Sequence, residues 1–95
     1  MNKTITTCVI DWLEKHDYSL QHWDVVAKEL LEHHQNSVAL ATSALAENLK
    51  TFHQKYQDAV VKPDNLLYDL LSLNFKQVNW VEVAESQYKR LNITP

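Results

Sequence analysis

The sequence of 95 residues contains no glycine, and this absence excludes several classes of protein. The phosphate-binding loops of nucleotide-binding proteins need glycine where the backbone approaches the phosphate. The nucleophile elbow of α/β-hydrolases needs glycine around its serine, and tight β-hairpin turns favour it because their φ angles are positive. A chain without glycine is therefore expected to be all-α.

Basic charge, cysteine and long apolar runs are also scarce. The formal net charge of −3 leaves no basic patch for nucleic acid or anionic lipid. Cys8 is the only cysteine and cannot form an intrachain disulfide, which favours a reducing compartment. No apolar run approaches the roughly 18 residues that cross a bilayer, and Asp11 and Glu14 interrupt any secretory hydrophobic segment. We expect a cytoplasmic protein without membrane contact, and we do not expect nucleic acid as a partner.

Helical periodicity is what the sequence does contain. Apolar residues recur at i, i+3, i+4 and i+7 along successive segments, which is the pattern of amphipathic helices. We therefore expect residues 1–95 to form a single small bundle of about five helices. The expected segments are 3–16, a second helix that begins at 20 after the capping Ser19, 37–61, 64–73, and a last helix that Asn79 caps and that ends near 91.

The third segment carries the longest apolar stripe, between a capping Ser37 and the helix-breaking Pro63. At 1.5 Å per residue this helix is about 37 Å long. We expect it to be a central helix, 37–61, flanked by two short helical pairs. One alternative stays open, because the stripes of the second and third helices are nearly in phase. Fusing them gives one helix of about 40 residues, which favours a dimer, and only residues 35–37 argue for a break.

Asparagine takes the place of glycine at the expected helix junctions. Its side chain caps helix N-termini, and its backbone tolerates the left-handed conformation that ends many helices. The asparagines at these junctions are Asn36, Asn65, Asn74, Asn79 and Asn92.

The three tryptophans, Trp12, Trp23 and Trp80, lie on apolar stripes, so we expect all three in the core. The segments that begin at Trp23 and Trp80 share the pattern Trp-x-x-Val-Ala, and both are predicted to start helices. The second segment resembles helix starts in small helical proteins of phage and mobile elements.

The residues that carry chemistry form no catalytic or metal-binding motif. Glu29 and His33 have the i, i+4 spacing that can bind Zn²⁺ or Fe²⁺, but HExxH and the paired Glu-x-x-His of di-iron bundles are absent. Whether His33 and His34 bind a metal stays open. Cys8 lies on an apolar stripe, and we expect it to be a buried, inert thiol. We expect no enzyme, no catalytic, metal-binding or cofactor-binding residue, and no metal as a partner.

The segment Val26-Ala27-Lys28-Glu29-Leu30 resembles the first helix of a helix-turn-helix, in which the pattern V-A-x-x-L is common. The helix that follows has no cation before Lys50. A recognition helix offers Arg, Lys or polar residues to bases and phosphates. Helix-turn-helix-like nucleic-acid binding is therefore only a further alternative.

Some apolar residues do not fit the helical stripes, and they are candidates for a contact surface. In the segment 64–73 the leucines cover an arc of about 160°, wider than the stripe of about 100° that a surface helix needs. This helix is either buried in the middle of the bundle or part of an interface with a partner protein or a second copy. The residues predicted to bind a partner are Leu66, Leu70, Leu73, Val25 and Leu40.

These observations favour a non-enzymatic protein–protein interaction module, a small adaptor or regulator that binds another protein or forms a homodimer. A phage- or mobile-element-encoded inhibitor of a host protein machine is the first alternative, because small size and the lack of catalytic motifs fit it equally well.

Overall fold

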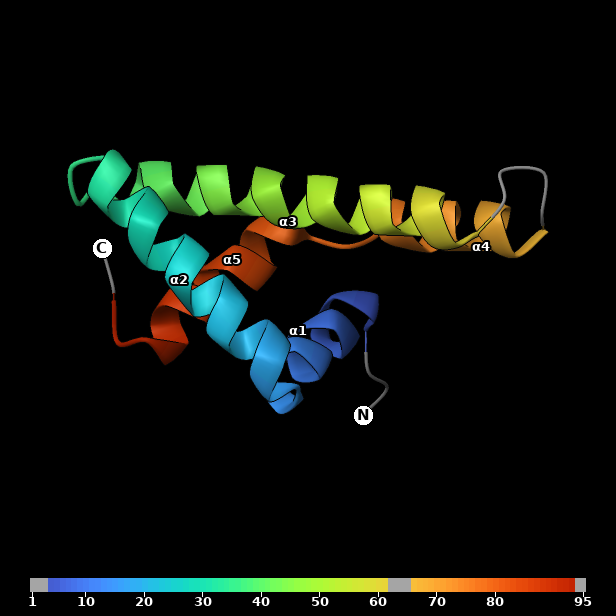
Figure 1. Ribbon diagram of the computed structural model, residues 1–95, viewed down its shortest axis with the longest axis horizontal. Coiled ribbons are helices and arrows are strands. Elements are labelled where there is room, and N and C mark those ends of the chain that lie inside the picture. Colours follow the sequence, from blue (N-terminus) through green and yellow to red (C-terminus); the bar gives the residue numbers. More distant parts are fainter. Residues whose placement is uncertain (1–3, 62–65, 94–95) are drawn as a thin grey trace.

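The computed structural model describes residues 4–61 and 66–93, and these residues form five helices and no strand (Figure 1). The all-α fold with one long helix is therefore confirmed. In the described part of the chain, no helix is both long enough and apolar enough to span a membrane. The helices are α1 (Ile5–Lys15), α2 (Asp17–His33), α3 (Val38–Val60), α4 (Leu66–Lys76) and α5 (Trp80–Arg90).

The longest helix, α3, runs along one side of the molecule in the view of Figure 1. α5 packs against α1, α2 and α3, and α2 packs in turn against α1 and α3. α1, α2 and α5 therefore share one core with α3.

Side-chain caps begin three of the helices. Thr4, Ser37 and Asn79 each accept a hydrogen bond from the backbone N–H three residues further on, at 3.1, 3.4 and 3.1 Å. Each bond satisfies one of the N–H groups that have no partner inside the helix. The predicted caps Ser37 and Asn79 are thus confirmed.

The junction between α1 and α2 is a single extended residue, His16. Its Nδ1 lies 2.7 Å from the carbonyl oxygen of Trp12 and donates to it, because a carbonyl can only accept. This bond satisfies one of the last carbonyls of α1. The predicted break at residues 17–19, with Ser19 as the cap, is wrong, since α2 already begins at Asp17.

α2 and α3 are separate helices, so the alternative of one fused helix is wrong. Gln35 and Asn36 both adopt left-handed backbone conformations, with φ of 56° and 66°, and Asn92 does the same after α5 with φ of 63°. Asn36 and Asn92 therefore act as junctions, as predicted. Asn74 does not, because α4 continues past it to Lys76, and Asn65 and Pro63 lie outside the described residues.

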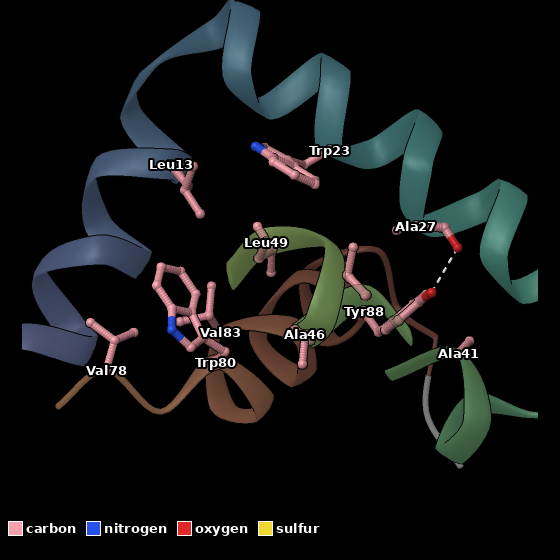
Figure 2. Close-up of a cluster of buried hydrophobic side chains, with 12 residues drawn as sticks. Leu13, Trp23, Ala27, Ala41, Ala46, Leu49, Val78, Trp80, Val83 and Tyr88 are labelled. Carbon is pink, nitrogen blue, oxygen red and sulfur yellow. Dashed lines mark hydrogen bonds between the residues drawn. The ribbon is translucent and has the colours of Figure 1, made fainter. Parts of the chain in front are cut away.

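The core lies where α1, α2 and α5 meet the first half of α3 (Figure 2). Leu45, Leu49 and Tyr88 are its largest fully buried side chains. The hydroxyl of Tyr88 donates a hydrogen bond of 2.7 Å to the carbonyl oxygen of Ala27, so its one polar group is satisfied inside the core. The predicted burial of Trp23 and Trp80 is confirmed. Trp80 starts α5, whereas Trp23 lies in the middle of α2 and starts no helix.

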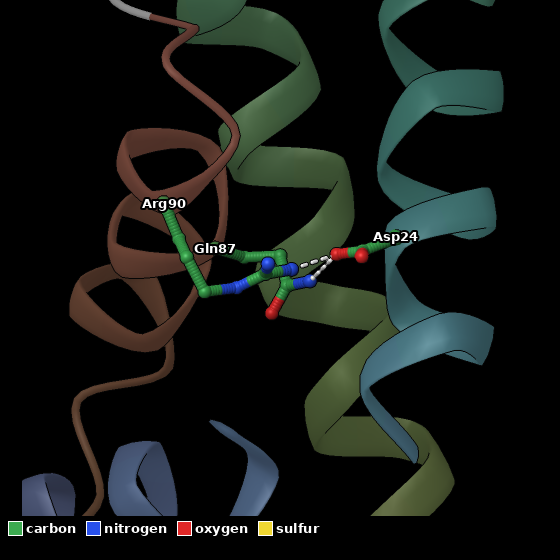
Figure 3. A network of polar contacts seen from close by, with 3 residues as sticks. All are labelled: Asp24, Gln87 and Arg90. Atoms are coloured by element: carbon green, nitrogen blue, oxygen red, sulfur yellow. Dashed lines mark hydrogen bonds and ion pairs between the residues drawn. The ribbon is translucent and has the colours of Figure 1, made fainter. Parts of the chain in front are cut away.

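A polar cluster ties α2 to the last turn of α5 (Figure 3). The carboxylate of Asp24 accepts hydrogen bonds from the Gln87 amide and from the Arg90 guanidinium. Asp24 and Arg90 are both partly buried and form an ion pair. A partly buried charge pair with a further hydrogen bond holds two elements in register more firmly than an exposed pair does.

α1 is rotated about its axis relative to the predicted stripe. Cys8 and Trp12 are exposed, Trp12 by 51%, so their predicted burial is wrong. Thr6 is buried in their place, and Ile10 packs against the core. The Thr6 hydroxyl accepts a hydrogen bond of 2.9 Å from the backbone N–H of Asn79. We attribute the rotation to this bond, because it draws the Thr6 side of α1 toward α5.

Candidate functional site

The second half of α3 and α4 extend beyond the rest of the bundle as a helical hairpin (Figure 1). We call α1, α2, α5 and residues 38–49 the body, and residues 50–60 together with α4 the hairpin. Among the described residues, no buried hydrophobic side chain lies between Lys50 and Gln77. Apolar packing in the hairpin is therefore limited to half-buried residues such as Leu71 and Phe75.

Most leucines of α4 are exposed, and only Leu71 is half-buried. None of the described side chains of α4 is buried, so the alternative that this helix lies in the middle of the bundle is wrong. Leu66, Leu70 and Leu73 are exposed by 73%, 48% and 58%. Their spacing of i, i+4 and i+7 places them on one side of the helix, and we call these three residues the leucine face.

Heptad positions separate the exposed residues of α4 from its half-buried residues. With Leu70 at a and Leu73 at d, every described residue at an a, d, e or g position is exposed, and every residue at b, c or f is half-buried. In coiled coils the a and d positions form the buried seam, so α4 presents its seam outward. The remaining positions are d for Leu66, e for Leu67 and Asn74, g for Asp69 and Lys76, b for Leu71, c for Ser72, and f for Tyr68 and Phe75.

Polar contacts explain why α4 has this orientation. The Gln57 amide, which is only 5% exposed, donates hydrogen bonds to the Ser72 hydroxyl at 2.7 Å and to the Tyr68 carbonyl at 3.1 Å. The Tyr68 hydroxyl donates to the Asp58 carboxylate at 2.5 Å, and this bond raises the pKa of the phenol. A buried amide needs such partners, and Ser72 lies on the side of α4 opposite the leucine face.

The other two predicted partner-binding residues lie elsewhere. Val25 in α2 and Leu40 in the first turn of α3 are exposed by 55% and 58%, and neither belongs to the hairpin. The structure therefore brings together Leu66, Leu70 and Leu73 and leaves Val25 and Leu40 as separate exposed positions.

Phe52 and Tyr56 are two further exposed apolar residues of the hairpin, and they were not predicted as site residues. Both lie on the long apolar stripe of α3, yet both are exposed. α3 has 23 residues, whereas α2 and α5 have 17 and 11. A long helix packed against shorter ones leaves part of its stripe uncovered, and this mismatch of lengths is the signal in the sequence.

Two cavities lie beside α3. One of about 430 Å³ opens between α3 and α4, with Lys50 and Lys76 at its wall and the Trp80 indole beside them. The other, of about 450 Å³, is a more apolar groove between the start of α3 and α5, with Thr42 and Tyr88 in its lining. Ser72 shares the first lining with Lys50 and Lys76, and Ser43 shares the second with Glu85 and Lys89. The Ser72 hydroxyl accepts a hydrogen bond from the Gln57 amide, so it takes part in the attachment of α4.

His53, near the start of the hairpin, is a half-buried histidine whose ring contacts two tryptophans. Its ring stacks on the indole of Trp80 at 5.1 Å and on that of Trp23 at 6.3 Å between centroids. Nδ1 donates to the carbonyl oxygen of Leu49 at 2.7 Å, which leaves Nε2 as the atom that would take a second proton. Burial lowers the pKa of His53. The imidazole is therefore a neutral packing group at the junction of the body and the hairpin.

The histidines at the end of α2 and the segment that resembles a helix-turn-helix lie outside the hairpin. Among the described residues, no group of three or more His, Cys, Asp or Glu side chains could hold a metal ion. The rings of His33 and His34 lie edge to face, 5.1 Å apart, at the end of α2. The segment that resembles a helix-turn-helix is followed by residues 34–37 and then by α3, whose first three turns contain no Lys or Arg.

Comparison with known proteins adds no relative. No protein-family model, no curated protein and no solved structure matches this chain.

Proposed function

We propose that this protein is a non-enzymatic protein–protein interaction module, and that the leucine face of α4 is its binding surface. The observation that supports this function is the orientation of α4, which turns its half-buried b, c and f positions toward α3 and its a and d leucines outward. An apolar seam that faces water in an otherwise ordered helix is typical of a surface that a partner covers.

Burying the leucine face against a partner contributes a substantial part of the free energy of association. Fully burying a leucine contributes about 1.5–3 kcal/mol, and Leu66, Leu70 and Leu73 are each roughly half to three-quarters exposed. Their complete burial contributes on the order of 3–6 kcal/mol, before the cost of association is subtracted. An α-helix with a similar apolar stripe is the complementary partner, because its side chains interdigitate with such a seam.

The proposal covers both an adaptor or regulator and an inhibitor of a host machine, since these differ in the identity of the partner and not in the surface. We also propose a cytoplasmic location. Cys8 is an exposed thiol in a chain with no second cysteine, and a reducing compartment suits such a group.

Leu70→Asp tests the proposed function. We expect the variant to keep the helical circular dichroism and nearly the melting temperature of the wild type, because residue 70 faces solvent in the monomer. We expect it to lose association, which is measured by light scattering of the pure protein and by pull-down from the source organism.

Two control variants show how loss of folding and an exposed charge outside the hairpin would appear in the same measurements. Leu45→Asp buries an unpaired carboxylate in the core and is expected to unfold the body. Leu40→Asp changes an exposed leucine outside the hairpin and is expected to bind as the wild type does. Unfolding of Leu70→Asp, or undiminished association by it, would show that the leucine face is not the binding surface.

A further inference from the structure

We infer that the occupant of the leucine face is the leucine face of a second copy, in an antiparallel pair of α4 helices. This inference rests on the proposed function and adds the identity and direction of the partner. Leu66, Leu70 and Leu73 occupy successive d, a and d positions. In an antiparallel pair an a position faces a d position, so Leu70 of each copy packs against the partner subunit's Leu73.

The charges beside the seam are complementary to those of a second copy only when the two α4 helices are antiparallel. Asp69 and Lys76 both occupy g positions, on the same flank of α4 and one heptad apart. In an antiparallel pair g faces g, so Asp69 of each copy meets the partner subunit's Lys76. In a parallel pair g faces e, and the e positions of α4 are the uncharged Leu67 and Asn74.

Two-fold symmetry turns this flank into two identical ion pairs. An isologous dimer uses the same surface patch on both subunits, so such a patch must be self-complementary. The g flank meets this condition because it carries one acidic and one basic residue, Asp69 and Lys76. The opposite flank places uncharged e positions against each other, so it adds no repulsion between like charges.

The position of α4 leaves this surface accessible. α4 lies at one end of the long axis, beside the second half of α3, and the body lies toward the other end (Figure 1). With 11 residues, α4 is about 16 Å long, so the seam is short. We therefore expect a weak dimer, with a dissociation constant of about 1 µM or higher.

A charge exchange in the g positions tests this inference. Asp69→Lys gives a homodimer in which lysines face lysines, and Lys76→Glu gives one in which carboxylates face carboxylates. We expect each variant alone to raise the dissociation constant about tenfold, measured by sedimentation equilibrium. An equimolar mixture of the two variants and the double variant Asp69→Lys/Lys76→Glu each restore opposite charges, so both are expected to dimerise as the wild type does.

Matched controls keep the same changes of charge but place them away from α4. Glu47→Lys in α3 and Lys28→Glu in α2 alter exposed residues of the body, and we expect neither to change dimerisation. Circular dichroism of each variant establishes that it is folded.

Three outcomes would overturn the inference. The first is a wild-type protein that remains monomeric at millimolar concentration. The second is a dimer that the single charge variants leave unchanged, and the third is a mixture that fails to restore association. The proposed function survives each of these if Leu70→Asp still abolishes binding of another protein, so the two failures are distinguishable.

Discussion

His53 is the residue at which the body and the hairpin meet. Its ring stacks on Trp23 and Trp80 from the body, and it also contacts the ring of Phe75 from α4 at 6.3 Å between centroids. Burial lowers the pKa of His53 below the ordinary value of 6.5. The fold therefore favours the neutral ring, and protonation of the ring disfavours the fold.

We expect the stability to depend on pH through His53, with a definite sign. Well above pH 6.5 the ring is neutral in both the folded and the unfolded chain, and its contribution is constant. As the pH falls from 6.5 toward the lower pKa of the folded state, the unfolded chain binds the proton first. The free energy of unfolding then decreases, by at most about 1.4 kcal/mol per pH unit for one proton.

Urea denaturation followed by circular dichroism, at pH 7.5 and at successive values down to pH 5, measures this effect. His53→Gln keeps a polar side chain at the position but cannot take up a proton, so it should reduce the slope. An equal slope in the wild type and the variant would assign the pH dependence to other groups.

At the scale of single elements, α4 differs from the other helices in how it is attached. α5 buries Trp80, Val83 and Ala84 in the core, whereas α4 buries no described side chain. It is attached through the hydrogen bonds of Gln57 and Tyr68 and through the half-buried Phe75. An element with few buried apolar contacts opens locally at a lower free energy than the whole domain unfolds. We therefore expect α4 to be the least stable of the five helices in the monomer.

Gln57→Ala is expected to weaken the attachment of α4 without unfolding the body. Two hydrogen bonds contribute about 1–2 kcal/mol, so amide hydrogen exchange in α4 should become roughly 5 to 30 times faster. Exchange in α2 and α5 should change little, because their core contacts do not involve Gln57.

Gln54→Ala is the control for this prediction. Gln54 is exposed and lines the cavity between α3 and α4, as Gln57 does, and its removal should not accelerate exchange in α4. Equal acceleration in all helices would contradict the separate attachment of α4.

At the scale of the whole molecule, the hairpin gives the chain an elongated outline of 42 × 32 × 23 Å, with a radius of gyration of 14.0 Å. The core occupies the body, and the leucine face occupies the hairpin. One end of the molecule thus supplies the stability, and the other end presents the apolar surface. An antiparallel α4 pair would join two molecules by their hairpins and place the two bodies at opposite ends.

We expect small-angle X-ray scattering to report this arrangement. At high protein concentration the radius of gyration of the wild type should rise well above 14.0 Å, because the two bodies lie far apart. Leu70→Asp should stay near the value of the monomer at every concentration. A dimer that is compact, with little increase in the radius of gyration, would indicate association through the body.

Local hydrogen-bond chemistry is the part of this structure that the sequence predicts well. The caps Ser37 and Asn79 and the left-handed Asn36 were predictable, because each depends on the geometry of only a few neighbouring residues. The burial of Trp23 and Trp80 followed from helical periodicity. Leu66, Leu70 and Leu73 were recognisable as candidates because their helix carries more leucine than one packed face can cover.

Contacts between distant segments decided what could not be predicted. The rotation of α1, which exposes Trp12, accompanies a hydrogen bond between Thr6 and Asn79, 73 positions apart. The orientation of α4 depends on the pairing of Gln57 with Ser72. In both cases the buried side of a helix includes a polar contact between segments distant in sequence, and periodicity alone carries no information on such pairs.

The stacking of Trp23 and Trp80 on one imidazole gives the protein an internal optical reporter. The fluorescence of an indole depends on the charge and polarity of the groups that touch it, and here two of the three tryptophans touch His53. The third, Trp12, stacks on His16 at the exposed end of α1. Emission spectra of single-tryptophan variants would therefore follow the base of the hairpin and the surface of α1 separately, without an attached dye.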